Sequence, residues 1–142
     1  MHDRLGGVRT VLAALALLAL GSAPAPPAAG GDTALVRDFL RAYRDAVRGT
    51  GPGLTPSEVR AEWLTPELNA RLDGWQAGHP GADPVFRAAT APGSWIAHAV
   101  GAAGGLGTVD VDERWPGGAV LRVRYTVQES DRTILDLQGA PA

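Results

Sequence analysis

Two stretches that flank Pro116-Gly117-Gly118 alternate apolar and charged residues, and this pattern restricts the fold more than any other feature of the sequence. Residues 108–115 read TVDVDERW, and residues 119–128 read AVLRVRYTVQ. A period of two residues is typical of strands that bury one face. A three-residue Pro-Gly-Gly loop suits a type I turn followed by a left-handed glycine. The sequence therefore predicts an antiparallel hairpin of residues 108–115 and 119–128.

The charged residues of this hairpin predict how its strands pair. With a three-residue loop, the apolar face pairs Val109 with Tyr125 and Val111 with Val123. The other face pairs Asp110 with Arg124 and Asp112 with Arg122. A two-residue loop would mix apolar and charged side chains on one face, because a slip of one residue turns every side chain over. We therefore expect one apolar face and one face of ion pairs, which mainly fix the register.

Two further strands are expected, at residues 94–100 and 133–138, with a glycine-rich connection over residues 102–107. A hairpin through Glu129-Ser130-Asp131 would give the pairs Tyr125–Leu135, Val123–Leu137 and Arg124–Asp136. In this register Arg124 lies between two aspartates. The last four elements then form an antiparallel meander.

Helical patterns precede the strands. Residues 34–48 carry apolar side chains at helical spacing, with Asp32 or Thr33 as the cap and Gly49 at the end. Thr55-Pro56-Ser57-Glu58 is a capping-box signature for a short helix to about Trp63, and Thr65-Pro66-Glu67 starts another that Gly78 and Pro80 close. Residues 79–83 read as a turn, and residues 85–89 as one more helical turn. Helices followed by a meander predict an α+β fold, with the helices on the apolar face of a curved sheet of three to four strands.

The N-terminal residues resemble a secretory signal. Arg4 and Arg9 precede a ten-residue apolar run, Val11 to Leu20, and small residues follow. Ten helical residues span only about 15 Å, which is short for a membrane anchor; an uncleaved anchor is the competing interpretation. We predict residues 1–30 to be a signal and a flexible Pro/Ala-rich segment, cleaved near Gly30. Residues 31–142 form one domain, which we expect to be secreted and, once cleaved, free of the membrane.

Composition excludes several classes. Without Asp3, Arg4 and Arg9, 11 arginines face 14 acids, a net charge of −3, which argues against nucleic-acid binding. The chain has no cysteine, and so no disulfide. Every Lys/Arg position is arginine, which is typical of a GC-rich genome.

Three segments carry a family resemblance. LVRDFLRAY at residues 35–43, LTPELNARL at 64–72 and DPVF at 83–86, followed by the closing strands, resemble the nuclear-transport-factor-two-like superfamily and its small secreted bacterial branch of unknown function. The resemblance covers residues 33–137. It implies a curved sheet wrapped around helices to leave a conical pocket, and it implies no catalytic residue. Members of the superfamily include isomerases, dehydratases, binding proteins and dimerisation modules, so shape selects no function.

Local motifs for other chemistry are better explained by structure. Gly105 to Gly107 is a G-x-G that precedes a strand, so we interpret it as a hairpin loop and not a phosphate loop. Asp110, Asp112 and Glu113 lie in a predicted strand, and we expect these acids to face arginines and not a cation. No histidine pair has metal spacing, and Ser94 lacks a nucleophile motif, so we predict no metal and no cofactor.

The mouth of the predicted cone supplies the candidate site. For binding, the candidates are Tyr43, Trp63, Trp75, Arg87, Trp95 and Tyr125; for catalysis, they are His98 as a base with Asp83 or Asp73. The tryptophans also suit a core, Asp83 suits a turn, and the sequence leaves open which sheet face carries His98. Whether the cone is open or filled by its own side chains is also open.

Three functional hypotheses follow. The first is a non-enzymatic module that binds a small apolar ligand or a protein partner, a second copy being one such partner, since four tryptophans offer rigid apolar surface. The second is a small isomerase or hydro-lyase-like enzyme that uses His98 with a carboxylate. The third is an immunity or inhibitor protein that pairs with a secreted toxin.

Overall fold

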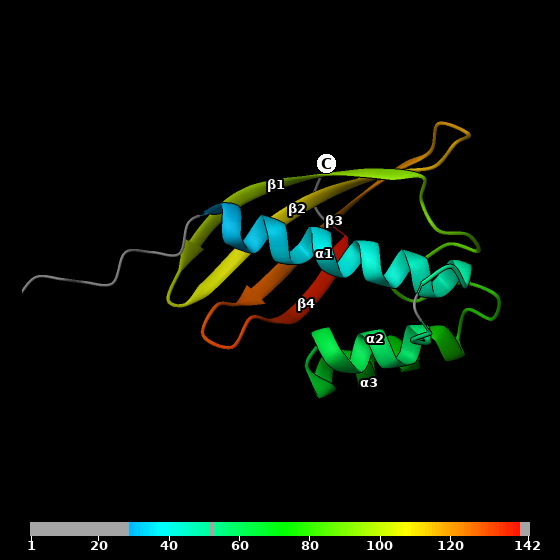
Figure 1. Cartoon of the computed structure of the whole chain (residues 1–142), viewed down its shortest axis with the longest axis horizontal. Helices are drawn as coiled ribbons and strands as arrows, with labels where there is room; N and C mark the ends of the chain where they lie inside the picture. Colours follow the sequence, from blue (N-terminus) through cyan, green and yellow to red (C-terminus); the bar gives the residue numbers. More distant parts are fainter. Residues whose placement is uncertain (1–28, 52, 140–142) are drawn as a thin grey trace, which may run out of the picture.

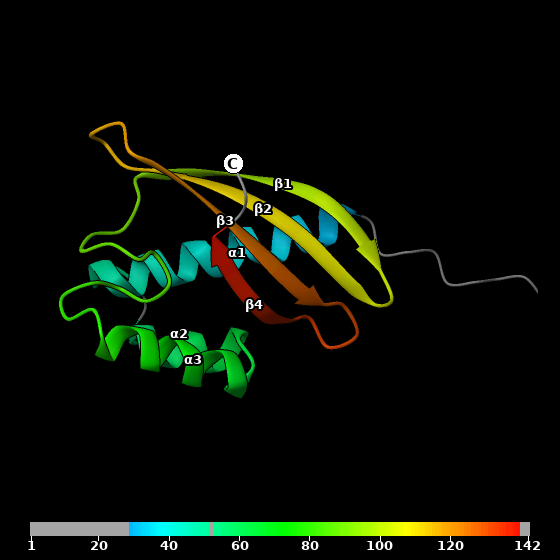
Figure 2. The ribbon, with the colours of Figure 1, turned by 180° about the vertical axis from the view of Figure 1, so that it is seen from behind.

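Three helices precede a four-stranded antiparallel sheet in the computed structural model, which describes residues 29–51 and 53–139. The elements are α1 (Ala29–Arg48), α2 (Pro56–Trp63), α3 (Pro66–Ala77), β1 (Ser94–Ala103), β2 (Leu106–Arg114), β3 (Val120–Gln128) and β4 (Thr133–Gly139). The strands lie in chain order, and α1 crosses one face of the sheet (Figure 1). From behind, the other face is free of helices (Figure 2). The predicted α+β meander is confirmed. The predicted signal lies outside the described residues except for its last two residues, and the predicted cleavage site near Gly30 falls in the first turn of α1.

The two short helices begin and end where their caps predict. Thr55 accepts the N–H of Glu58, and the Glu58 side chain accepts the N–H of Thr55, so the capping box is complete. Thr65 caps α3 by accepting the N–H of Leu68, and Gly78 ends this helix. Within the described residues, no helix is long and apolar enough to cross a membrane.

The start of α1 differs from the prediction. The helix begins at Ala29, so Asp32 and Thr33 lie inside it and do not cap it. Asp32 is buried against β2, where a methyl group at Gly107 would overlap its carboxyl group. Its side chain also hydrogen-bonds to that of Glu129 and thereby raises the pKa of Glu129. Contacts with the sheet therefore extend the helix beyond its apolar pattern.

The first hairpin pairs as the charges predict. Val111 lies opposite Val123 and Asp112 opposite Arg122, and Gly118 has the expected left-handed conformation, with φ of 96°. Arg122 Nε lies 2.6 Å from Asp112 Oδ1, and Arg124 Nε lies 2.7 Å from Asp110 Oδ1. Both arginines also donate from a second nitrogen, so each ion pair is bidentate.

The predicted register of the second hairpin is wrong. Tyr125 pairs with Leu137, because an irregularity between Thr126 and Val127 leaves Leu135 without a partner in the ladder. Arg124 lies opposite Gln138, and Asp136 pairs instead with Arg71 of α3. The shift keeps Ile134 and Leu137 in the core, both at most 1% exposed.

The predicted glycine-rich connection is shorter than expected. Strands β1 and β2 continue to a two-residue turn of Gly104 and Gly105, which have φ of 61° and 81°. Two left-handed residues are what a type I′ hairpin turn needs, and glycine adopts them without strain.

Residues 85–89 do not form a helix. They belong to a tight bend in which Asp83 donates its N–H to Ala88 O (2.8 Å) and accepts that of Arg87 (2.6 Å). Arg87 has a φ of 55° and so breaks any helical continuation. This bend brings the DPVF segment to the end of the sheet.

Aromatic rings fill the space between α1 and the sheet. Phe39, Tyr43, Phe86 and Tyr125 are each at most 1% exposed. The Tyr43 ring lies 5.6 Å from that of Phe39 and 5.4 Å from that of Phe86. The space between α1 and the sheet is therefore occupied by the chain's own side chains.

Candidate functional site

Glu113 is the most unusual side chain of the core. It points from β2 to the helix side of the sheet, with Trp95 and Leu121 as its cross-strand neighbours. It is 0% exposed, and neither carboxyl oxygen has a hydrogen-bond partner in the part of the chain that the structure describes. Burial raises the pKa of Glu113 well above its usual value, and the charge of Asp83 adds to the rise, whereas Arg87 opposes it. The environment therefore favours the neutral acid.

Asp83 organises the bend that faces Glu113. Its Oδ2 accepts the Tyr43 hydroxyl at 2.7 Å, and its Oδ1 accepts the N–H groups of Val85 and Phe86, each at 2.9 Å. Burial first, and then the charge of Asp83, raise the pKa of Tyr43, so its hydroxyl keeps its proton. These three bonds fix the carboxylate and the backbone that carries Arg87.

Tyr125 and Arg87 complete this group of polar side chains. Tyr125 is fully buried, and its hydroxyl has no hydrogen-bond partner within residues 29–51 and 53–139. Burial and the charge of Glu113 raise the pKa of Tyr125. Arg87 also leaves a buried nitrogen, Nε, without a partner. We call Tyr43, Asp83, Arg87, Glu113 and Tyr125 the interior cluster, since each alters the pKa of at least one other or is altered by it.

A cavity of about 430 Å³ opens beside this cluster. Its lining includes Phe86, Arg87, Thr90, Trp115, Val120 and Leu121. Trp115 donates its indole N–H to Thr90 O at 2.9 Å, which ties the β2–β3 loop to the bend. Glu113 lies in the row next to this lining, because Leu121 is its strand partner. The interior cluster thus has one member, Arg87, at the wall of a cavity.

The proposed catalytic pairs are not brought together. His98 lies on the helix-free face of the sheet, with Nε2 3.6 Å from Asp112 Oδ2, whereas Asp83 lies on the helix side. Asp73, on α3, pairs with Arg60 at 3.1 Å. His98 therefore has a carboxylate neighbour, but it is one that Arg122 already binds.

The binding candidates divide into two sets. Tyr43, Arg87 and Tyr125 meet in the interior cluster. The other candidates are the tryptophans: Trp63 packs against the core 6.2 Å from Phe39, Trp75 stacks on His79 at 3.9 Å, and Trp95 lies under Arg44 at 4.7 Å. The tryptophans therefore do not form one aromatic pocket.

The sequence interpretation missed Glu113. It grouped Glu113 with Asp110 and Asp112 as acids that face arginines, and for Glu113 this is wrong. The signal was present, since Glu113 has the same odd parity in the strand as Val109 and Val111. An acid on the apolar side of an alternating strand marks a buried carboxyl group.

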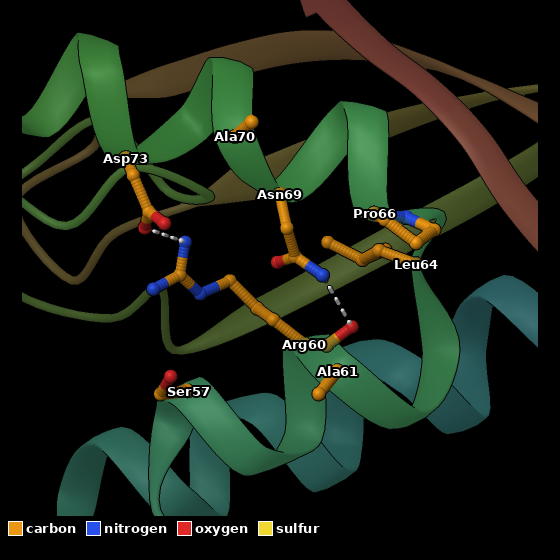
Figure 3. Close-up of a pocket in the computed structure, with 8 residues that line it drawn as sticks. All are labelled: Ser57, Arg60, Ala61, Leu64, Pro66, Asn69, Ala70 and Asp73. Atoms are coloured by element: carbon orange, nitrogen blue, oxygen red, sulfur yellow. Dashed lines mark hydrogen bonds and ion pairs between the residues drawn. The ribbon is translucent and has the colours of Figure 1, made fainter.

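A second cavity, of about 420 Å³, lies between α2 and α3 (Figure 3). Figure 3 shows Arg60 reaching Asp73, while the Asn69 amide donates to Arg60 O at 3.1 Å. These bonds join the two helices, while the buried Arg60 Nε has no partner among the described residues. Over residues 29–51 and 53–139, no group of three or more His, Cys, Asp or Glu side chains could hold a metal ion.

Comparison with known proteins shows the fold alone. The sequence matches no protein-family profile and no curated protein. A solved protein of unknown function from Bacteroides thetaiotaomicron is similar in structure, with a TM-score of 0.58 and 16% identity over 77% of this chain and 89% of that one. A chain of the type VI effector–immunity complex Tae3–Tai3 from Ralstonia pickettii is also similar, with a TM-score of 0.52 and 11% identity over 78% of this chain and 97% of that one.

Proposed function

We propose that this chain is an exported, non-enzymatic protein-interaction module of the nuclear-transport-factor-two-like type, and that β1 is its docking strand. The observation that carries the proposal is the character of β1. It lies at the edge of the sheet and runs for ten residues with no Asp, Glu, Lys or Arg. Ile96 and Val100 on this strand are 47% and 51% exposed.

Soluble proteins usually protect such an edge. Charged side chains, proline, short length or a bulge keep the free N–H and C=O groups from pairing with another chain. In β1 the bulge comes only after Ala99, so residues 94–99 remain regular, and they include no Asp, Glu, Lys or Arg. A strand of this kind is suited to β-augmentation by a protein partner.

The partner that we propose is a second copy of the chain. A two-fold interface places the same surface against itself, so charged edges would meet like charges, and an uncharged edge does not. The adjacent ion pairs of Asp110 and Asp112 are already satisfied within one copy and need no external partner. The fold-level likeness to a chain of an effector–immunity complex supports the same functional class and leaves a toxin as the alternative partner.

Sedimentation equilibrium over a range of micromolar concentrations tests this proposal. We expect the mass to double reversibly in the wild type and to stay monomeric in Ile96→Lys, because a charge on the edge prevents pairing. Val120→Lys is the matched control: Val120 is 54% exposed but lies on β3, so this variant should still dimerise.

Amide hydrogen exchange gives an independent reading. Dimerisation should protect the outward amides of residues 94–99 as concentration rises. A wild-type monomer with fast exchange there at every concentration would refute the pairing of β1 with itself. An equal loss of dimer in both lysine variants would place the interface elsewhere.

The enzyme hypothesis has weaker support. Its base, His98, lies on the opposite side of the sheet from Asp83 and beside an aspartate that Arg122 engages. A detected turnover that His98→Ala abolishes without loss of stability would restore it.

A further inference from the structure

We propose that the cavity beside Arg87 binds a small amphipathic carboxylic acid, with the guanidinium group of Arg87 as the anchor for its carboxylate. This inference is independent of the pairing proposed for β1. Each can fail without the other, because the cavity is built from the 86–90 bend and the ends of β2 and β3.

The cavity has the size and the walls of a small-molecule site. Its volume of about 430 Å³ lies within the range of ligand pockets, and its walls are mainly apolar, with Phe86, Trp115 and Leu121 as the large side chains. Arg87 is the one charged residue among the described residues that line it. Such a cavity favours a ligand with an apolar body and one polar group.

Arg87 is a cation without a hydrogen-bond or ion-pair partner among the described residues. It makes no side-chain hydrogen bond or ion pair within the described residues, and its Nε is buried. A guanidinium group that loses water without gaining an acceptor is unfavourable, and a carboxylate is the acceptor that matches its fork geometry. The nearby Glu113 does not take this role, since both of its oxygens are also without partners.

The backbone holds Arg87 in place at this wall. Its φ of 55° is rare for a residue with a side chain, and the bonds between Asp83 and both Arg87 and Ala88 maintain it. Tyr43 in turn holds the Asp83 carboxylate. This fixed backbone places the start of the Arg87 side chain at the wall before a ligand arrives, which lowers the entropy lost on binding.

Glu113 sets the sign of the ligand's charge. A charged Glu113 would neutralise Arg87 and repel an anion. Because burial raises its pKa, Glu113 is favoured as the neutral acid, which leaves Arg87 as the one charged side chain among the described residues that line the cavity. The nearby Asp83 carboxylate does not line the cavity, and it accepts the Tyr43 hydroxyl and the N–H groups of Val85 and Phe86.

The first test uses the wild-type protein and pairs of probes that differ only in charge. Benzoate is compared with benzamide, and hexanoate with hexanamide, by two-dimensional NMR titration at neutral pH. We expect the acids to bind with Kd below about 1 mM and to shift the Trp115 indole and Arg87 Nε signals, and the amides to bind roughly tenfold or more weakly.

The second test removes the anchor. Arg87→Asn should weaken benzoate binding roughly 10- to 100-fold and reduce the difference between acid and amide, whereas Arg87→Lys should retain part of it. Asparagine tolerates the left-handed backbone. Arg132→Asn is the matched control, since Arg132 also has a positive φ, of 57°, but is exposed in the β3–β4 turn.

Three results would overturn the proposal. The first is equal affinity for acid and amide, and the second is unchanged benzoate affinity in Arg87→Asn. The third is no shift of either cavity signal at 10 mM probe, a concentration on the order of ten times the expected Kd. If Arg87→Asn does not fold, the comparison of acid and amide affinities on the wild type still tests whether the cavity prefers a carboxylate. Neither test depends on the oligomeric state, so a failure of the β1 proposal is read separately.

Discussion

Glu113→Gln should stabilise this protein at neutral pH, although it changes a fully buried residue of the sheet. Glutamine keeps the shape of glutamate, and it keeps unpaired polar atoms, but it does not ionise. The substitution therefore removes only the free energy needed to keep an ionisable group neutral, or to charge it, in the core. Because one pKa unit corresponds to about 1.4 kcal/mol, we expect a gain at pH 7 of about 1.4 kcal/mol for each unit by which the folded pKa of Glu113 exceeds the unfolded one, counted no further than pH 7.

The pH dependence carries the more specific signature. The folded pKa of Glu113 lies above the unfolded one, so the unfolded chain releases this proton first as pH rises. The contribution of Glu113 to stability is therefore fully present below the unfolded pKa of about 4.3 and is lost as the pH rises toward the folded pKa. The groups that face it are Asp83, Arg87 and Tyr125; Asp83 strengthens the effect and Arg87 weakens it.

Urea unfolding of the wild type and Glu113→Gln at half-unit steps from pH 4 to pH 8 measures this signature. Other titrating groups act equally in both proteins, so the difference isolates Glu113. We expect the difference in unfolding free energy to grow with pH and to be smallest near pH 4. By calorimetry, a gain of 1 kcal/mol raises Tm by about 4 °C in a domain of this size. A variant that is less stable than the wild type at pH 7, or a difference independent of pH, would refute the reasoning and indicate that Glu113 pairs with Arg87 in solution.

Three further predictions concern the same scaffold. Gly107→Ala should cost about 1–3 kcal/mol in urea unfolding, because its methyl group meets the Asp32 carboxyl, whereas Gly101→Ala, with nothing within 4 Å, should be neutral or slightly stabilising; equal effects would mean that α1 does not pack there. Tyr43→Phe should lose about 1 kcal/mol, since Asp83 keeps its two backbone donors; a loss above about 3 kcal/mol in denaturation curves would show that the hydroxyl supports the whole bend. The pKa values of Asp110 and Asp112 are lowered first by their hydrogen bonds to Arg124 and Arg122, so their contribution is present above the unfolded pKa and is lost as pH falls; carboxyl pKa values of ordinary size in an NMR titration would contradict the ladder.

The sequence predicts local geometry well where one physical signal acts alone. The β2–β3 register follows from alternation, from charge pairing and from a loop of known length, and all three agree on Asp112 opposite Arg122. The β3–β4 register does not follow from these signals. The irregularity beside Thr126 places Ile134 and Leu137 in the core, so this register depends on tertiary packing. Alternation within a strand carries no information on where the ladder is interrupted.

The candidate site was predicted less well, and the reason is also physical. Tyr43, Asp83, Arg87 and Tyr125 were all named, but as parts of an open cone together with His98 and the tryptophans. The side of the sheet on which His98 lies depends on its pairing with Asp110, and the glycines of the β1–β2 turn obscured that register. Aromatic residues were likewise ambiguous, since core and pocket use the same side chains.

Glu113 shows how a sequence argument could have located the site. Among the acids of β2, Asp110 and Asp112 have even parity and face arginines, and Glu113 alone has the parity of the buried valines. A buried carboxyl group occurs in a core only where other interactions offset its desolvation, or where the stability that it costs is tolerated for another purpose. The same region holds the left-handed Arg87, a second departure from the usual rules. Of these two independent departures, Arg87 lies at the wall of the cavity and Glu113 in the row next to it. Together they are better evidence for a binding site than any single residue type, and this is why the Arg87 cavity, and not the tryptophans, is the place to test for a ligand.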